Sequence, residues 1–336
     1  MYKWIISEKL AVSPMPALEE IRELSNIFDG VVVLIEPHEY PGGDIRNYIN
    51  LWKDMGVEVY YSPTRDFWFP PILELYHITK WIHEKIKEGG RVLVHCMGGI
   101  GRSGTVAASY IIYSSDIVPW NAVSHVRKHI PGALEVPRQE KIVYDYYYML
   151  KYISDRKLLE MIDREAAKRN YGAGIKHVSK VTQLSIEILT DMGLFKNIDD
   201  YTKKAVVIAS ILHDMGYSSG DHGEKSVEIA SKILGMTDLD DKIIDLILTI
   251  IRCHHINWCK EIRYDLPLGI LWIADYLDHG FDNTVDYIEV DVEDSDLVLK
   301  IHCGIECSHN IDELRKILPS IEEIIGKRIT IKRYYE

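Results

Sequence analysis

Cys96 lies at the centre of the stretch with the clearest capacity for chemistry in this 336-residue chain. The preceding residues 91–95 form a short apolar run rich in β-branched side chains, which predicts a buried strand. Three glycines follow the cysteine within five residues, and a helical pattern begins at Arg102. A tight loop between a strand and a helix N-terminus directs successive backbone N–H groups inward and binds anions. We therefore expect this loop to stabilise the Cys96 thiolate and to hold a phosphate, with Arg102 as a bidentate donor.

The order His, Cys, five residues, Arg, Ser at positions 95–103 resembles the signature of the protein tyrosine and dual-specificity phosphatases. The resemblance implies that Cys96 is the nucleophile of a phosphocysteine mechanism without a cofactor, and that Arg102 binds phosphate and stabilises the transition state. It also implies that Ser103 hydrogen-bonds the departing thiolate and that His95 helps to set the loop and the acidity of the thiol. The implied phosphate-binding residues are Met97, Gly98, Gly99, Ile100, Gly101 and Arg102. The alternative is an inert cysteine in a glycine turn, which would not need Arg and Ser at these two positions.

Asp66 follows a predicted strand at residues 57–61, in a loop bounded by prolines. A thiolate that attacks a phosphoester expels an oxyanion, so the leaving group needs a proton from a nearby acid. In the dual-specificity family the acid lies about this far before the cysteine, and the resemblance assigns the role to Asp66. Alternatively, Asp66 only pairs with Arg65 or caps the following helix. Asp44 is a second, weaker candidate for the acid.

Gln139 lies in the first turn of a predicted helix over residues 137–152. In the phosphatase families a glutamine in this region can orient the water that hydrolyses phosphocysteine, and an ordinary solvated glutamine is the equal alternative. The loop between Cys96 and Arg102 contains no lysine, whereas phosphoinositide phosphatases of this class tend to have basic residues there. Phosphotyrosine, or another aryl phosphate on a protein, is therefore the expected substrate.

Histidines and aspartates recur at the ends of apolar helical stretches in the second half of the chain. Imidazole and carboxylate together suit divalent Mn, Fe, Ni or Mg better than Zn. The order of these residues resembles that of the HD-domain phosphohydrolases. The resemblance implies a divalent metal ion held by His177, His213, Asp214 and Asp275.

A second ion would bind His222, His254 and His255, as in those HD domains that hold two metals, with Asp214 bridging the pair. A metal-activated hydroxide would then attack phosphorus. Alternatively, His222 is a polar residue at a helix N-terminus, and one of His254 and His255 is an ordinary surface histidine. Asp278 is a candidate to hydrogen-bond one of these metal-binding residues without binding the metal itself.

Several elements must position these residues. Strands and helices alternate over residues 1–157, which predicts an α/β phosphatase domain with a mainly parallel sheet and helices on both faces. Ligands bind beyond the carboxyl ends of such strands, where Cys96 is expected. Residues 158–283 predict an all-α HD domain. Residues 284–336 predict a small β-β-α-β subdomain whose helix Pro319 interrupts.

Composition limits the function classes. The net charge of −12 argues against a non-specific nucleic-acid binder, and no apolar run reaches the length of a membrane span. Five cysteines in so long a chain do not predict a disulfide framework, and Cys303 and Cys307 are expected to be a free pair. A reducing cytoplasm fits this count and a thiolate at Cys96. A dimer interface in the C-terminal subdomain is left open.

Together these patterns predict a bifunctional phosphoester hydrolase that acts on phosphorylated proteins or small phosphoesters. The first domain would remove phosphate by a cysteine route, and the second would hydrolyse a phosphoester such as a nucleotide by a metal route. Two alternatives stay open. One is a regulatory sensor of a phosphorylated ligand in which one domain controls the other, and the other is a phosphatase of a small metabolite.

Overall fold

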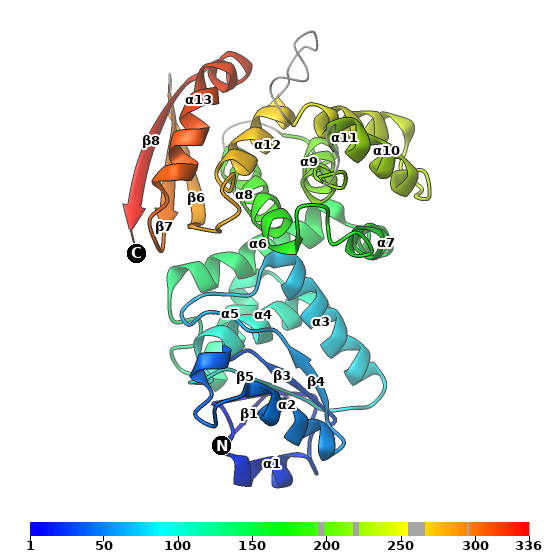
Figure 1. The fold of residues 1–336 in the computed structure, drawn as a ribbon, viewed down its shortest axis with the longest axis vertical. Coiled ribbons are helices and arrows are strands. Elements are labelled where there is room, and N and C mark those ends of the chain that lie inside the picture. Colours follow the sequence, from blue (N-terminus) through cyan, green and yellow to red (C-terminus); the bar gives the residue numbers. More distant parts are fainter. Residues whose placement is uncertain (194–197, 218–221, 255–265, 294–295, 336) are drawn as a thin grey trace. The chain divides into compact units, whose positions relative to one another are not determined.

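A computed structural model describes residues 1–193, 198–217, 222–254, 266–293 and 296–335 (Figure 1). The chain divides into two compact units, Met1–Tyr147 and Tyr148–Glu336. The division lies earlier than the boundary expected at residue 157. The residues expected to form a separate C-terminal subdomain belong to the second unit.

The first unit contains a five-stranded sheet in the order β1-β2-β5-β3-β4. The strands are β1 (Lys3–Ile6), β2 (Leu10–Ser13), β5 (Val92–His95), β3 (Gly30–Val33) and β4 (Glu58–Tyr61). Only the edge strand β1 runs antiparallel to its neighbour, and the other pairs are parallel. The prediction of a mainly parallel sheet is confirmed.

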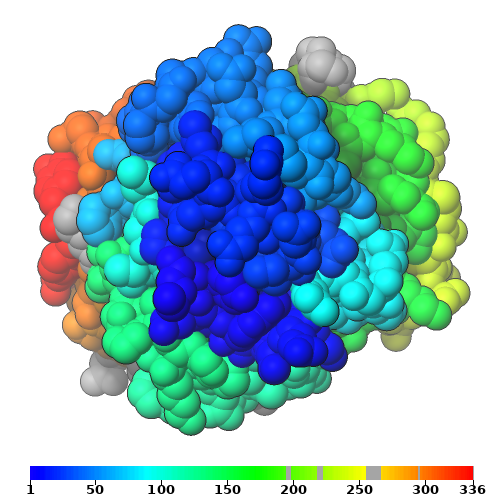
Figure 2. All heavy atoms as spheres, turned by 90° about the horizontal axis from the view of Figure 1, so that it is seen from below, coloured from blue at the N-terminus to red at the C-terminus, as the bar shows by residue number. Residues whose placement is uncertain are grey.

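Helices cover both faces of this sheet, because every residue of β2, β3 and β5 is buried. One face packs against α1 (Leu18–Leu24) and α2 (Ile45–Asp54) in a core that includes the fully buried Trp52. On the other face α3 (Ile72–Lys87) and α4 (Gly101–Ser115) pack against each other and against β5. The unit is completed by the short turn η1 (Pro37–Glu39), by α5 (Pro119–His129) and by the first part of α6 (Pro137–Ile153), whose last residues belong to the second unit. Figure 2 shows the surface that the N-terminal segment, in dark blue, contributes to this unit.

The register of the parallel strands brings three loops together at one edge of the sheet. Val33 is opposite both Tyr61 and His95, so β3, β4 and β5 end at the same level. Beyond these ends the backbone stays paired, since the N–H of Leu34 donates to His95 O at 3.0 Å and that of Ser62 to Val33 O at 3.0 Å. The loops that follow β3, β4 and β5 therefore share one small region.

The second unit begins with helices. They are α7 (Arg156–Ala167), α8 (Ile175–Gly193), α9 (Asp200–Leu212), α10 (His222–Leu234), α11 (Asp241–Arg252) and α12 (Leu266–Tyr276). Helix α8 packs against α9 and α12, and nearly the whole of α12 is buried. The predicted all-α region is confirmed. Among the described residues, no helix is both long enough and apolar enough to cross a membrane.

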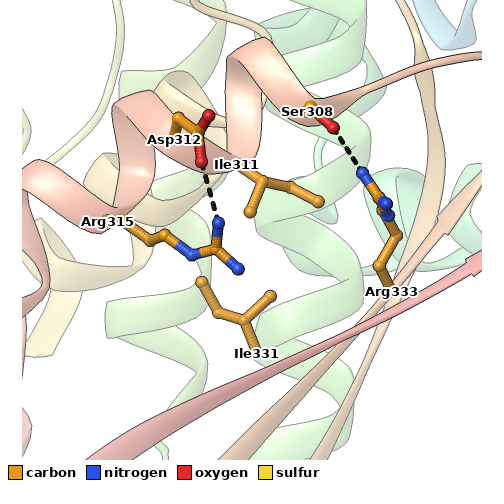
Figure 3. Close-up of a pocket in the computed structure, with 6 residues that line it drawn as sticks. All are labelled: Ser308, Ile311, Asp312, Arg315, Ile331 and Arg333. Carbon is orange, nitrogen blue, oxygen red and sulfur yellow. Dashed lines mark hydrogen bonds and ion pairs between the residues drawn. The ribbon is translucent and has the colours of Figure 1, made fainter.

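A second sheet, of order β6-β7-β8, follows these helices. Strands β6 (Val285–Val292) and β7 (Asp296–Cys303) form an antiparallel hairpin, and α13 (Ser308–Ile325) crosses over to β8 (Arg328–Tyr335), which is parallel to β7. The β-β-α-β prediction is confirmed. A hollow of about 320 Å³ lies between α13 and β8, and Figure 3 shows its lining. There Arg315 pairs with Asp312 at 2.8 Å, so one cation of the hollow is already neutralised.

The prediction that Cys303 and Cys307 are free was wrong, because they form a disulfide. Cys303 ends β7 and Cys307 is the N-cap residue of α13, and the short turn between them brings their Cα atoms to 6.2 Å. Cys96 is a free cysteine and is buried.

Candidate functional sites

The loop from β5 to α4 wraps closely around the Cys96 sulfur. Sγ accepts a hydrogen bond from the N–H of Gly99 at 3.2 Å and lies 3.3 Å from the hydroxyl of Ser103. Both groups can donate a hydrogen bond to a negatively charged atom at this position. Because Cys96 is only 2% exposed, water competes little for these donors.

Gly99 is required at its position for a steric reason. Its φ is +72°, and a Cβ there would lie 2.4 Å from the backbone nitrogen of Pro14. The loop is held against this segment by a hydrogen bond from the Met15 N–H to Met97 O at 3.1 Å. The N-terminal strands thus fix the curvature of the loop.

Arg102 is 1% exposed, and acceptors from two of the neighbouring loops surround its guanidinium. Glu39 accepts from Nη1 at 2.6 Å and from Nη2 at 2.7 Å, and the carbonyl of Thr64 accepts from Nη1 at 2.8 Å. Burial opposes the charge, but the hydrogen bond to Glu39 and the nearby charges of Cys96, Glu39 and Asp66 together raise the pKa of Arg102. The Nε atom is buried and makes no hydrogen bond within the described part of the chain. This leaves Nε as the donor available to a bound oxyanion.

Asp66 lies in the loop after β4, with its side chain 54% exposed and Oδ1 3.0 Å from Nη2 of Arg102. Asp66 therefore contacts Arg102. It does not cap α3, because the N-cap residue of that helix is Pro71. Asp44 serves a different purpose, since it caps α2 by accepting the N–H of Arg46 at 2.9 Å. Of the two candidate acids, Asp66 is the one at the Cys96 loop.

His95 is fully buried behind the loop, at the end of β5. The hydroxyl of Tyr48 lies 3.1 Å from its Nε2, and Nδ1 is 3.4 Å from the carbonyl oxygen of Cys96. Burial lowers the pKa of His95 to about 4, so the imidazole is neutral at neutral pH. A neutral ring can bridge Tyr48 and the cysteine backbone.

Gln139 is buried, and both ends of its amide are engaged. Nε2 donates to the carbonyl oxygen of Trp68 at 3.0 Å, and Oε1 accepts the N–H of Glu135 at 2.9 Å. The same amide borders the loop, because a Cβ on Gly101 would lie 2.7 Å from Nε2. Gln139 thereby links the loop of Asp66 to the loop of Cys96.

Two residues of this site were missed from the sequence. Glu39 lies in η1 after β3, and Tyr48 lies on α2. Both are far in the chain from the motif at residues 95–103. The only available signal was position, since Glu39 follows a strand that ends at the same sheet edge.

Six residues with metal-ligating side chains converge in the second unit. Their donor atoms fall into two groups, in each of which the atoms lie within 4.8 Å of one another. The groups are His177, His213 and Asp275, and Asp214, His222 and His254. His255, the remaining ligand expected from the sequence, is outside the described residues.

Asp214 faces both groups with different oxygens. Its Oδ2 lies 3.6 Å from Nε2 of both His177 and His213. Its Oδ1 lies 3.3 Å from Nε2 of His254 and 4.0 Å from that of His222. A carboxylate placed in this way can bridge two ions.

The buried donor atoms fit divalent metal ions. The Nε2 atoms of His177 and His213 are buried without a hydrogen bond in the described ranges, while their Nδ1 atoms are each held at 2.9 Å, by Asp278 and by Ser210 O. Such an arrangement orients Nε2 towards a ligand. Burial opposes protonation, yet Asp275 and Asp278 raise the pKa of His177 to about 10, so the site favours positive charge.

A turn at residues 170–174 packs against the backbone of Asp214. Asn170, Tyr171, Gly172 and Gly174 all have positive φ, and a Cβ on Gly172 would lie 1.6 Å from the carbonyl oxygen of Asp214. The backbone of Gly172 therefore packs directly on the ligand backbone.

Comparison with known proteins agrees with both patterns. Residues 50–148 match the family model "Dual specificity phosphatase, catalytic domain", and residues 174–280 match the model "HD domain". Phosphatidylglycerophosphate phosphatase PTPMT2 of Arabidopsis thaliana is 30% identical over 45% of this chain and 64% of its own length. Cyclin-dependent kinase inhibitor 3 of Rattus norvegicus is 30% identical over 34% of this chain and 56% of its own length.

Solved structures match the first unit as well. Tk-PTP in its active form is 39% identical, over 44% of this chain and 95% of its own, with a TM-score of 0.41. The chain spans about half to two thirds of the curated relatives above. The chain thus joins two hydrolase domains, a dual specificity phosphatase catalytic domain and an HD domain, as the residue patterns predicted.

Proposed function

We propose that the first unit hydrolyses phosphomonoesters through a phosphocysteine intermediate, and that the second hydrolyses a phosphoester with divalent metal ions. The observation that carries the first part is the position of the Cys96 sulfur between the Gly99 N–H, the Ser103 hydroxyl and a loop closed by Arg102. The sulfur can attack phosphorus, while the amide donors and the guanidinium stabilise the negative charge on the phosphoryl oxygens in the transition state.

The reaction proceeds in two displacements. The Cys96 thiolate attacks phosphorus, a P–S bond forms and the P–O bond to the leaving group breaks, while Asp66 gives its proton to that oxygen. Water then attacks phosphorus, Asp66 takes back a proton, and the P–S bond breaks to release phosphate and the thiolate. Ser103 stabilises the departing sulfur by donating a hydrogen bond.

Arg102 binds the phosphoryl oxygens in both steps. Its Nε is open to an oxygen, while Glu39 holds the other side of the guanidinium. Asp66 contacts Nη2 before substrate binds, so an incoming phosphate displaces that contact and moves the carboxyl towards the leaving group. Gln139 would position the hydrolytic water from its place beside Gly101.

Phosphotyrosine on a protein is the proposed substrate. The loop offers no lysine for a second phosphate, and an aryl leaving group fits the exposed aromatic Phe67 beside the acid. Phosphatidylglycerophosphate, which two of the relatives carry in their names, is the competing substrate that a panel must include.

In the second unit, His177, His213, Asp275, Asp214, His222 and His254 would hold one or two divalent ions. Such ions polarise a phosphoryl group and activate water. Asp278 accepts from Nδ1 of His177 and so keeps Nε2 directed to the centre of the group.

Turnover of an aryl phosphate, a phosphotyrosyl peptide and a nucleotide by the full chain tests both proposals. Activity that survives a chelator and is lost in Cys96→Ser belongs to the first unit, and activity lost with chelator and in Asp214→Ala belongs to the second. Turnover that depends on neither residue would refute the proposal. Binding without turnover at either site would favour the sensor alternative, and preference for a small metabolite would replace the phosphoprotein.

A further inference from the structure

The loop of Asp66 also carries a cation that the reaction above does not use. Arg65 is exposed, and its guanidinium carbon lies 4.8 Å from the ring centroid of Trp68. The guanidinium carbon of Arg138, which is 7% exposed, lies 6.0 Å from the same centroid. Cation–π contacts hold a guanidinium in place without neutralising its charge.

Arg65 has no carboxylate partner in the part of the chain that the structure describes. Arg46 and Arg315, which are also exposed, are neutralised instead, since Arg46 pairs with Asp44 at 2.5 Å and Arg315 with Asp312 at 2.8 Å. In a chain with a net charge of −12, an uncovered and pre-oriented cation is available to an anion from outside.

The neighbours of Arg65 place it next to Arg102 of the Cys96 site. The carbonyl of Thr64 accepts from Arg102 at 2.8 Å, and Asp66 Oδ1 lies 3.0 Å from the same guanidinium. Phe67 follows, 50% exposed. The residues on both sides of Arg65 therefore contact the guanidinium that would bind the phosphate, Thr64 through its backbone carbonyl and Asp66 through its side chain.

We propose that Arg65 is a specificity-determining residue that binds the carboxylate of an Asp or Glu adjacent to phosphotyrosine in a peptide. The inference rests on the proposed phosphatase function. An anionic membrane is recognised by clusters of several basic residues. The Asp66 loop offers one uncovered cation, Arg65, beside the exposed aromatic ring of Phe67, which fits a single acidic side chain next to an aryl phosphate.

The test compares two phosphotyrosyl peptides that differ only in Glu or Gln on both sides of the phosphotyrosine. We expect the full chain to prefer the acidic peptide by about threefold to fivefold in kcat/KM, the range of an exposed ion pair. The preference should weaken as salt is raised. It should fall to about one in Arg65→Gln and persist in part in Arg65→Lys, which keeps the charge. Arg22→Gln, at an exposed arginine on α1, should keep the full preference.

Binding of the same peptides to the Cys96→Ser chain, measured by calorimetry, needs no turnover. Equal kcat/KM for both peptides with Cys96-dependent turnover would overturn the role of Arg65 and leave the proposed function intact. Absence of Cys96-dependent turnover would overturn the proposed function, and equal affinity of the two peptides would then also overturn this inference. Faster turnover of a phosphorylated lipid in anionic vesicles, slowed by Arg65→Gln, would replace the peptide by a membrane surface.

Discussion

Glu39 accepts hydrogen bonds from both terminal nitrogens of Arg102, at 2.6 and 2.7 Å, whereas Nε of Arg102 has no hydrogen-bond partner among the described residues. Burial acts to raise the pKa of Glu39, but the hydrogen bonds from Arg102 and the Glu36 backbone, together with the positive charge of Arg102, hold that pKa below its usual value. The pair is mutually dependent, because a guanidinium that is 1% exposed needs a fixed counter-charge.

Glu39→Gln should lower kcat/KM for an aryl phosphate by about tenfold, the cost of a charge-assisted hydrogen bond. The reason is that Arg102 loses its orientation, and stability should fall as well because a buried charge loses its partner. Steady-state kinetics and denaturant unfolding measure the two effects. Glu36→Gln, at a neighbouring residue that does not contact Arg102, is the control. Unchanged kinetics in Glu39→Gln would contradict the role of this pair.

Asp66→Asn should lower kcat by about a hundredfold or more for substrates with poor leaving groups. The loss should be smaller for p-nitrophenyl phosphate, because its leaving group needs little protonation. A series of aryl phosphates of increasing leaving-group pKa measures the dependence. Asp44→Asn removes only the charge of an exposed N-cap residue that pairs with Arg46, and should leave the series unchanged. An equal loss for every leaving group would argue against general acid catalysis by Asp66.

Stability should decrease as pH falls from about 6.5 to 4, in part because of His95. Burial lowers the pKa of His95 to about 4. Between about pH 6.5 and pH 4 the unfolded chain therefore binds a proton at His95 that the folded chain does not bind. The contribution has a slope of about 1 kcal/mol per pH unit. His95→Asn should flatten the slope, as read from denaturant midpoints of both chains at several pH values. Parallel slopes would show that His95 is not the group that titrates.

Asp278→Asn should weaken metal binding by about tenfold to a hundredfold, because the carboxylate that orients His177 is lost. Asp214→Ala should bind fewer ions per chain, since it faces both groups. Elemental analysis after dialysis against graded chelator measures both. Asp200→Ala, at an exposed position of α9, is the control. Cys96-dependent activity should not change in any of these variants.

Gly172→Ala should destabilise the second unit by several kcal/mol and reduce its metal content. A Cβ there would lie 1.6 Å from the carbonyl oxygen of Asp214, at a φ of +73°. Gly193→Ala is a matched change on α8, where a Cβ meets nothing within 4 Å, and should be neutral. Thermal unfolding and elemental analysis report the two effects. Normal metal content in Gly172→Ala would show that the turn does not support the ligands.

Residues 95–103 could be identified from sequence because the loop is local, with the nucleophile, donors and arginine in one contiguous stretch. Glu39 and Tyr48 could not, because only the register of distant strands brings them to His95 and Arg102. Strand β2 was missed since it has four residues and follows directly on β1, yet it is the neighbour of β5.

In the second unit, too, some features could be predicted from the sequence and others could not. The order of histidines and aspartates predicted which residues the structure brings together as possible metal ligands, whereas the two directions in which the Asp214 oxygens face depend on helix packing. Pro319 was expected to interrupt its helix, but α13 continues through it, because the tertiary contacts of that helix outweigh the lost hydrogen bond.

The edge shared by β3, β4 and β5 has a practical consequence for labelling. The segments that carry Glu39, Asp66 and Cys96 follow the carboxyl ends of these strands, so the turns at the opposite ends of the strands face away from them. A fluorophore or short peptide inserted at Gly56, before β4, or at Gly89, before β5, should report on the fold while catalysis continues undisturbed.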